Sequence, residues 1–254
     1  EVYHDGQFFG DLMLDEACGF IERNRQRPFF IYFAMNMPHY PYQGEEHWLH
    51  YYRDLPYPRN LHAAFVSTLD QRVERLVDKI EQLGLREDTI IVFQSDHGHS
   101  CEERAHGGGG NAGPYRGAKF SLFEGGIRVP AIISWPGKLP TSAVRDAIAH
   151  SCDWLPTVAE LCEVPLVNND IDGKSLVSVI QSESAETPHE TLHWTIGNSW
   201  AVRQGPWKLL GNPRDTSDKA PLGPDHKLYL VNLEEGKSEM KNLAAEHADV
   251  VQRL

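Results

Sequence analysis

Residues 89–98 read TIIVFQSDHG, an apolar run that ends in a carboxylate, an imidazole and a glycine. Before this run, residues 69–83 place apolar side chains on one stripe at helical spacing, and Gly84 is positioned as the stop of that helix. Further upstream, residues 29–35 form a continuous apolar run bounded by prolines, which is typical of a strand buried on both faces. Strand, helix and strand in this order need a crossover connection. The sequence therefore predicts an α/β fold, a mainly parallel sheet with helices on both faces.

Further elements are expected on both sides of this core. Apolar residues at helical spacing after Asp11, a candidate N-cap, predict a helix, and residues 131–135 predict a third buried strand. Asp153 is placed to cap a short helix that ends at Cys162. From residue 191 the pattern changes to short strands and a terminal helix, at residues 191–196, 200–203, 207–210, 227–232 and 244–254. We therefore expect two domains, the remainder of an α/β domain at residues 1–185 and a small C-terminal antiparallel β subdomain with its terminal helix at residues 186–254.

The composition is that of a folded, acidic protein. The 254 residues include 24 Lys and Arg against 36 Asp and Glu, a formal net charge of −12, which argues against nucleic acid and anionic membrane as partners. The apolar run at residues 29–35 is far shorter than the ~18–20 residues that a membrane-spanning helix needs. The 4 cysteines form no CxxC pair, so neither a zinc ribbon nor a disulfide scaffold is predicted. Because the chain starts with Glu1 and no signal-like segment follows, we expect it to begin at a cut.

Two polar clusters follow predicted strands and are therefore expected at one edge of the sheet, where ligands bind in parallel α/β folds. Asp96 and His97 offer a carboxylate and an imidazole, both of which can ligate a divalent cation. His39 lies between two prolines on a stiff loop, where its ring can donate a proton or a hydrogen bond to a bound anion. The alternatives are a turn in which Asp96 bonds local amides, and a surface histidine in a proline turn.

The long connection over residues 95–128 carries cations among glycines. Lys119 is the best candidate ligand for an oxyanion, because its ammonium is a compact point charge. Arg116 and Arg128 are expected instead to pair with nearby acids such as Glu124 and to hold the loop. A strand-end Asp-His pair, a loop histidine and a lysine in a glycine loop together suggest metal-assisted handling of a sulfate or phosphate ester.

Several segments, in this order, closely resemble the type I sulfatase (arylsulfatase) family of the alkaline-phosphatase-like superfamily. In the first half of the chain they are PFFIYF at 28–33, PHYP at 38–41, SDHG at 95–98, RGAK at 116–119 and FEGGIRVP at 123–130. In the second half they are DGKSL at 172–176, AVRQGPWKL at 201–209 and LYLVNL at 228–233. The resemblance covers essentially the whole chain.

The resemblance implies a sulfuric ester hydrolase that cleaves sulfate monoesters, with calcium as the usual metal and a formylglycine nucleophile made from Cys or Ser. By this resemblance Asp96 and His97 match metal ligands. His39 and Lys119 match catalytic residues that hold the sulfate and assist the leaving oxygen, with His39 as the proton donor. A sulfated carbohydrate substrate and a periplasmic, secreted or lysosomal location are expectations at the level of the family.

Two features depart from the family pattern. Many sulfatases have Asn at the position of His97, and because imidazole is an unusual ligand for a cation that prefers oxygen, zinc and manganese stay open beside calcium. The formylglycine motif needs Cys or Ser with Pro or Ala two residues on and Arg four residues on, and neither the cysteines nor Ser100 fits it. We therefore expect the chain to be the C-terminal part of a sulfatase. Its partner is then the missing N-terminal segment of the same protein, with the nucleophile, an aspartate pair and another lysine.

Two other functions stay open. A phosphodiesterase or phosphonate hydrolase of the same superfamily is favoured by Asp96 and His97 and disfavoured by the match of the glycine loop and the C-terminal half. A non-catalytic sulfate-binding fragment is the second, since the nucleophile motif is absent from the sequence. Metal content and the preference between a pair of substrates would distinguish the phosphodiesterase or phosphonate hydrolase from a sulfatase. An intact formylglycine motif upstream would exclude the non-catalytic fragment.

Overall fold

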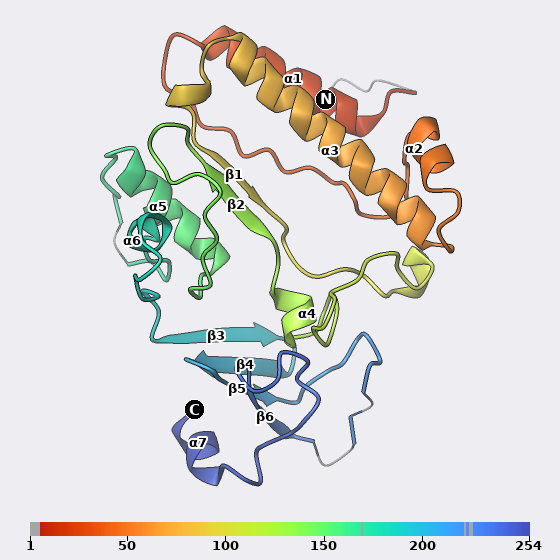
Figure 1. Cartoon of the computed structure of the whole chain (residues 1–254), viewed down its shortest axis with the longest axis vertical. Helices are drawn as coiled ribbons and strands as arrows, with labels where there is room; N and C mark the ends of the chain where they lie inside the picture. Colours follow the sequence, from red (N-terminus) through yellow and green to blue (C-terminus); the bar gives the residue numbers. More distant parts are fainter. Residues whose placement is uncertain (1–5, 169, 221, 224–225) are drawn as a thin grey trace. The chain divides into compact units, whose positions relative to one another are not determined.

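The computed structural model describes residues 6–168, 170–220, 222–223 and 226–254, and the chain divides into two compact units (Figure 1). The first unit comprises Glu1–Thr89 and His99–Asn111, and the second comprises Ile90–Gly98 and Ala112–Leu254. His39 therefore belongs to the first unit. Asp96, His97 and Lys119 belong to the second.

The first unit is built on two long helices that pack along each other. α1 (Phe9–Asn24) contacts α3 (Arg59–Gln82), and α2 (Glu46–Tyr51) packs on α3 (Figure 1). Their apolar stripes bury Leu14, Ile21 and Phe65. Two 3-10 turns, η1 (Arg86–Asp88) and η2 (Glu103–Ala105), complete the unit.

Both predicted helices of this unit are confirmed, with differences where they begin. Phe8 is the N-cap of α1, so the prediction of Asp11 as the cap was wrong. Asp11 lies in the first turn, and its carboxylate is 2.9 Å from the guanidinium of Arg72, a buried residue of α3. Gly84 has φ +69, the left-handed conformation predicted for the residue that follows a helix.

Residues 29–35 do not form the predicted strand. They are assigned no regular structure, and the side chains of Phe30 and Tyr32 are 78% and 85% exposed. A strand is defined by hydrogen bonds to a neighbouring strand, and the described part of the first unit contains no strand that could pair with this segment. The prediction of a strand buried on both faces was therefore wrong for this chain.

The second unit contains two antiparallel sheets. β1 (Ile91–Gln94) pairs with β2 (Ala131–Ser134). The other sheet has the order β3-β4-β5-β6, formed by β3 (Thr191–Ile196), β4 (Ser199–Gln204), β5 (Trp207–Gly211) and β6 (Leu228–Asn232). This sheet confirms the predicted antiparallel C-terminal strands, which differ from the predicted ones by at most one residue at each end.

The predicted parallel pairing is not found among the described residues, where every strand pair is antiparallel. β2 follows β1 through the connection at residues 95–128, which holds only short helical turns, so the chain reverses direction where a crossover helix would have kept it parallel. Phe93 and Ile132 on this pair are 40% and 60% exposed, so the predicted burial of both faces is not observed either.

Helices surround the two sheets of the second unit. They are α4 (Glu124–Ile127), η3 (Ser151–Asp153), α5 (Trp154–Leu161), α6 (Val177–Gln181) and α7 (Ala248–Arg253). Asp153 precedes α5 as predicted, but its carboxylate accepts from the N–H groups of His150 and Lys174 rather than from α5. The predicted domain boundary between residues 185 and 186 stays a prediction, because both sides of it lie in the second unit.

Two apolar clusters form the core of the four-stranded sheet. Phe123, just before α4, packs with Leu210 and Tyr229 on one side of the sheet, and Leu209 and Leu230 pack with α7 in the other cluster. The start of α4 is thereby attached to β5 and β6. Among the described residues no helix is both long and apolar enough to cross a membrane.

Candidate active site

Asp96 and His97 lie in the turn after β1, separated from the strand by Ser95. The N–H of His97 donates to Asp96 Oδ1 at 3.0 Å, so the local turn that was the alternative for this pair is present. His97 Nδ1 lies 2.8 Å from the carbonyl oxygen of Gly98, and because a carbonyl only accepts, this ring nitrogen carries a proton. His97 Nε2 lies 3.1 Å from Asp96 Oδ2. With the proton on Nδ1, Nε2 of a neutral imidazole is an acceptor, so Nε2 and Asp96 Oδ2 are two candidate ligand atoms for a cation.

The Asp96 and His97 side chains are 82% and 41% exposed, so the pair is open to a ligand. Among the described residues, no group of three or more His, Cys, Asp and Glu side chains is placed to hold a metal ion. The pair therefore offers two ligands, and a divalent cation, which takes at least four, would need others.

Glycines attach the Lys119 loop to the end of β1. The N–H of Gly98 donates to the carbonyl oxygen of Gly126 at 2.9 Å, and the N–H of Gly125 donates to that of Arg116 at 2.6 Å. A Cβ atom on Gly98 would lie 1.9 Å from the carbonyl oxygen of Gly125, and one on Gly125 would lie 2.6 Å from that of Arg116. Only glycine permits this approach. The structure thus brings the loop that carries Lys119 to the turn after β1.

Lys119 is partly buried, and its Nζ lies 4.9 Å from the ring centroid of Phe120. Phe120 itself has φ +70 and is 41% exposed. A bulky residue in the left-handed region is uncommon and persists where its surroundings hold it. Here the N–H of Ser121 donates to the carbonyl oxygen of Ala118 at 2.9 Å, and Ser121 Oγ donates to the carbonyl oxygen of Arg214 at 2.7 Å.

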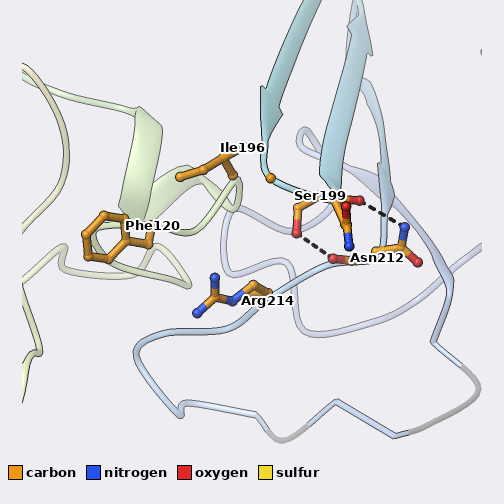
Figure 2. A pocket seen from close by; sticks show the side chains of 7 residues that line it. Phe120, Ile196, Ser199, Asn212 and Arg214 are labelled. Carbon is orange, nitrogen blue, oxygen red and sulfur yellow. Dashed lines mark hydrogen bonds between the residues drawn. The ribbon is translucent and has the colours of Figure 1, made fainter.

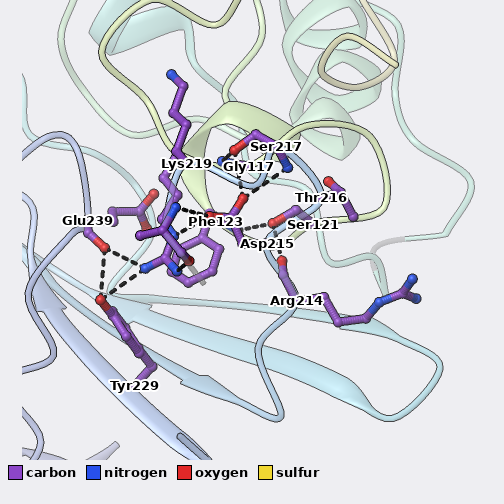
Figure 3. A network of polar contacts seen from close by, with 12 residues as sticks. Gly117, Ser121, Phe123, Arg214, Asp215, Thr216, Ser217, Lys219, Tyr229 and Glu239 are labelled. Atoms are coloured by element: carbon purple, nitrogen blue, oxygen red, sulfur yellow. Dashed lines mark hydrogen bonds and ion pairs between the residues drawn. The ribbon is translucent and has the colours of Figure 1, made fainter. Parts of the chain in front are cut away.

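Arg116 has a structural position. It is 1% exposed, and it donates to Asp215 Oδ2 at 2.7 Å, to the Tyr229 hydroxyl at 2.9 Å and to the carbonyl oxygen of Glu239 at 3.0 Å. Figure 3 shows Tyr229 and Glu239 on one side of this network and Asp215 on the other. The prediction that Arg116 pairs with an acid is confirmed, although Asp215 takes the place expected for Glu124.

The pairing with Arg116 uses an ionised carboxylate on Asp215, and the pKa of Asp215 is lowered. Burial alone would raise the pKa of Asp215, but hydrogen bonds from Ser217 and Arg116 bring it below its usual value. The Ser217 hydroxyl also accepts from the N–H of Gly117 at 3.0 Å, so the same turn holds the loop before Lys119.

Glu124 sits in a second buried group of charges. The ammonium of Lys208, which is 0% exposed, lies 2.8 Å from Glu124 Oε1 and 3.1 Å from Glu239 Oε1. Arg128 and Arg203 each lie 3.8 Å from Glu124 Oε2, so the predicted pairing of Arg128 is confirmed. Burial alone would raise the pKa of Glu124, but Lys208 brings it below its usual value, whereas burial raises the pKa of Glu239.

His39 is exposed on the first unit. Its Nδ1 lies 2.6 Å from the carbonyl oxygen of Tyr40, so Nδ1 carries a proton. The imidazole lies 4.2 Å from the Tyr40 ring, and the guanidinium of Arg104 lies 5.4 Å from that ring. The structure places the loop of Lys119 with Asp96 and His97, while a shared site with His39 stays a prediction.

A hollow of about 500 Å³ opens beside Phe120 in the second unit (Figure 2). Its lining residues are Phe120, Ile196, Gly197, Asn198, Ser199, Asn212 and Arg214. The sequence assigned no binding role to any of them. The Gly-Asn turn that joins two of the predicted strands was the only sequence signal for a loop at this place. Asn212 and Arg214 reach the hollow from a different part of the chain, and no local pattern marks them.

The described elements define a mixed α/β protein with a C-terminal antiparallel sheet, and comparisons with known proteins give it a family. The Sulfatase family model matches residues 5–164. The arylsulfatase of Hemicentrotus pulcherrimus is 35% identical over 201 residues, which cover 78% of this chain and 34% of that protein. The chain belongs to the sulfatase family.

Two carbohydrate-related proteins match nearly the whole chain. The N-acetylgalactosamine-6-O-sulfatase of Bacteroides thetaiotaomicron is 26% identical over 265 residues, 96% of this chain and 49% of that protein. The solved structure of Ps i-CgsB in complex with k-i-k-neocarrahexaose has a TM-score of 0.82 and 25% identity, and covers 99% of this chain and 55% of that chain. The chain thus spans about a third to a half of the length of these curated relatives.

Proposed function

We propose that the protein to which this chain belongs is a sulfatase that hydrolyses sulfate monoesters. The observation that carries the proposal is the packing of Gly98 and Gly125, which holds the Lys119 loop at the turn of Asp96 and His97 in a chain of the sulfatase family. Lys119 then offsets negative charge that develops on the bridging oxygen as the S–O bond breaks. His39 is proposed as the donor that protonates the leaving oxygen.

A divalent cation is proposed at Asp96 and His97. His97 Nε2 and Asp96 Oδ2, which lie 3.1 Å apart, fit this assignment, because imidazole nitrogen and carboxylate oxygen are both ligand types of divalent cations. The exposed carboxylate suits calcium, and the imidazole leaves zinc and manganese as alternatives. The metal, when bound, would neutralise sulfate oxygens and activate the nucleophile.

The nucleophile is proposed to be a formylglycine in an N-terminal segment of the same protein, which is also the proposed partner of this chain. The exposed apolar side chains of Phe30, Tyr32 and Ile132 support such a partner, because apolar surface of this kind is usually covered. A mainly parallel central sheet of the alkaline-phosphatase-like type is proposed for the whole protein. A periplasmic, secreted or lysosomal location is proposed with it.

The experiment compares 4-nitrophenyl sulfate with the phosphate diester bis(4-nitrophenyl) phosphate as substrates of the full-length protein. We expect turnover of the sulfate, and we expect Asp96→Asn to lower both the bound metal, measured by elemental mass spectrometry, and kcat. Asp54→Asn is the matched control, since this carboxylate is 88% exposed and belongs to the first unit. The identity of the metal in the unmodified protein separates calcium from zinc and manganese.

Preferred turnover of the phosphate ester would replace the proposal by a phosphodiesterase or phosphonate hydrolase. If a protein with metal bound and a folded structure hydrolysed neither ester, the sulfate-binding fragment would be the better account. A peptide map that shows an upstream Cys or Ser converted to formylglycine would remove that account directly.

A further inference from the structure

The hollow in Figure 2 lies next to the proposed reaction site, because Phe120 follows Lys119 directly and the centroid of its ring lies 4.9 Å from Lys119 Nζ. Three stretches of the second unit line it: the loop of Phe120, the turn between β3 and β4, and the segment after β5 with Asn212 and Arg214. Its volume of about 500 Å³ lies within the usual range of small-ligand sites, roughly 300–1,000 Å³.

Phe120 places its aromatic ring at this hollow while its backbone adopts an unfavourable conformation. Its φ of +70 is unfavourable for a bulky residue, and with the residue 41% exposed the cost is not offset by full burial of the ring. Hydrogen bonds on both sides of Phe120 hold this conformation, from Ala118 N–H to Thr216 Oγ1 at 3.2 Å and from Ser121 Oγ to the carbonyl oxygen of Arg214 at 2.7 Å. The ring and the Arg214 backbone are therefore fixed relative to each other.

Arg214 supplies a cation whose charge is not used for structure. Arg116, Arg128 and Arg203 of the same unit each lie within 4.0 Å of a carboxylate, whereas no described carboxylate lies that close to the exposed Arg214 guanidinium. In Figure 2 the Arg214 side chain extends toward the side of the hollow on which Phe120 lies. A guanidinium in this position can bind a sulfate or carboxylate group through two parallel hydrogen bonds.

Asparagine side chains complete the lining. Asn212 Nδ2 donates to the carbonyl oxygen of Asn198 at 2.9 Å, and Ser199 Oγ donates to the carbonyl oxygen of Asn212 at 2.7 Å (Figure 2). These bonds fix the turn between β3 and β4. Asn212 Oδ1 and the amide of Asn198 have no hydrogen-bond partner among the described residues, so they are available to hydroxyl groups of a ligand.

We propose that this hollow is a subsite for a second sugar ring of an anionic oligosaccharide whose sulfate is cleaved at the Lys119 site. Phe120 packs against the apolar face of that ring, Arg214 binds its sulfate or carboxylate group, and Asn198 and Asn212 bond its hydroxyls. A small aryl sulfate has no second anionic group for Arg214 to bind. The inference rests on the proposed function and names its substrate class.

The test uses the full-length protein and three substrates: 4-nitrophenyl sulfate, a disulfated disaccharide and a monosulfated disaccharide that contains a uronate. The variant is Arg214→Gln, with Arg253→Gln as the control, since Arg253 is an exposed arginine of α7. We expect Arg214→Gln to raise KM by about tenfold or more for the disaccharides whose anionic group it binds, which is the effect of losing one charge-assisted hydrogen bond. Turnover of 4-nitrophenyl sulfate should stay within about twofold, as for the control.

A loss confined to the disulfated substrate would identify a sulfate subsite, and a loss confined to the uronate would identify a carboxylate subsite. Equal losses on 4-nitrophenyl sulfate and on the disaccharides, or no change on any of them, would overturn the proposal. If the unmodified protein hydrolyses none of the substrates, the proposed function fails. Calorimetric binding of the two disaccharides, with and without Arg214→Gln, then still decides whether the subsite exists.

Discussion

The charged side chains of the second unit form two sets, one buried in a network of partners and one exposed. Arg116, Lys208 and Glu124 are at most 3% exposed, and each has more than one charged or polar partner in the buried network. Asp96 and Arg214 are exposed and lie in segments that are positioned through their backbones. The buried charges bond to one another and determine the path of the chain, while the exposed charges remain available to a ligand.

The difference shows that a cation's role cannot be assigned from its residue type or its place in a glycine loop. Arg116 and Lys119 are three positions apart, yet the first is 1% exposed beside Asp215 and the second is only partly buried beside the exposed Phe120. Removing one partner of a buried pair leaves an uncompensated charge in a dry environment, and this costs far more than removing a charge at the surface. Substitutions should therefore separate the two sets by their effect on the free energy of unfolding.

The largest effect is expected for Arg116→Leu. This change leaves the carboxylate of Asp215 and the hydroxyl of Tyr229 without their donor, and we expect it to lower the free energy of unfolding by about 3–5 kcal/mol. Urea denaturation followed by tryptophan fluorescence measures it, with Arg253→Leu as a surface control expected within about 0.5 kcal/mol. A loss below about 1 kcal/mol would mean that the buried network does not hold the loop.

Gly98→Ala is expected to come next. A Cβ atom at this position would lie 1.9 Å from the carbonyl oxygen of Gly125, so the backbone must move, at a cost of about 1–3 kcal/mol. Gly236→Ala is the matched control, because a Cβ atom there meets no atom within 4 Å. If both variants unfold at the same urea concentration, the close approach of the turn after β1 to α4 is not required.

We expect Glu124 and Glu239, the two buried carboxylates around Lys208, to make contributions to the free energy of unfolding that change with pH in opposite directions. The pKa of Glu124 is lowered, so its ionised form stabilises the fold above the ordinary value of 4.5 and this stabilisation is lost as the pH falls. The pKa of Glu239 is raised by burial, so its contribution is present below 4.5 and is lost as the pH rises.

Urea denaturation of Glu124→Gln and Glu239→Gln between pH 4 and pH 7 tests these signs. The difference in free energy of unfolding between the unmodified protein and Glu124→Gln should widen as the pH rises. The corresponding difference for Glu239→Gln should narrow. Differences that change in the same direction for both variants would contradict the assignment of the two carboxylates.

The sequence predicted those parts of the molecule that depend on local patterning. Helical spacing identified α1 and α3, and alternation with turn residues identified β3 to β6, because these signals lie within single segments. The same reasoning failed at residues 29–35, where no strand forms, and in the parallel direction expected for β1, since a strand's partner and direction depend on residues far away in the chain. An apolar run alone cannot specify them.

The same distinction applies to the candidate site. Asp96, His97 and Lys119 could be singled out because they lie in short motifs, and the glycines that join them are part of those motifs. The pairing of Arg116 with Asp215 joins residues 99 positions apart, and the hollow combines Phe120 with Asn198 and Arg214 from separate segments. Nothing local in the sequence marks either of these contacts.

Lys119→Ala is expected to change the free energy of unfolding least, and it tests the comparison between buried and exposed charges most directly. Because Lys119 is only partly buried, its loss should change the free energy of unfolding by less than about 1 kcal/mol, against several for Arg116→Leu. Yet kcat of the full-length protein on 4-nitrophenyl sulfate should fall by about 10²–10³, the usual effect of removing one group that stabilises the transition state. Lys241→Ala, at a lysine that is 69% exposed, should change neither quantity. Lys119→Ala could instead lower the free energy of unfolding as much as Arg116→Leu and leave kcat unchanged. Lys119 would then belong with the buried structural charges, and the division of the loop into structural and catalytic cations would be wrong.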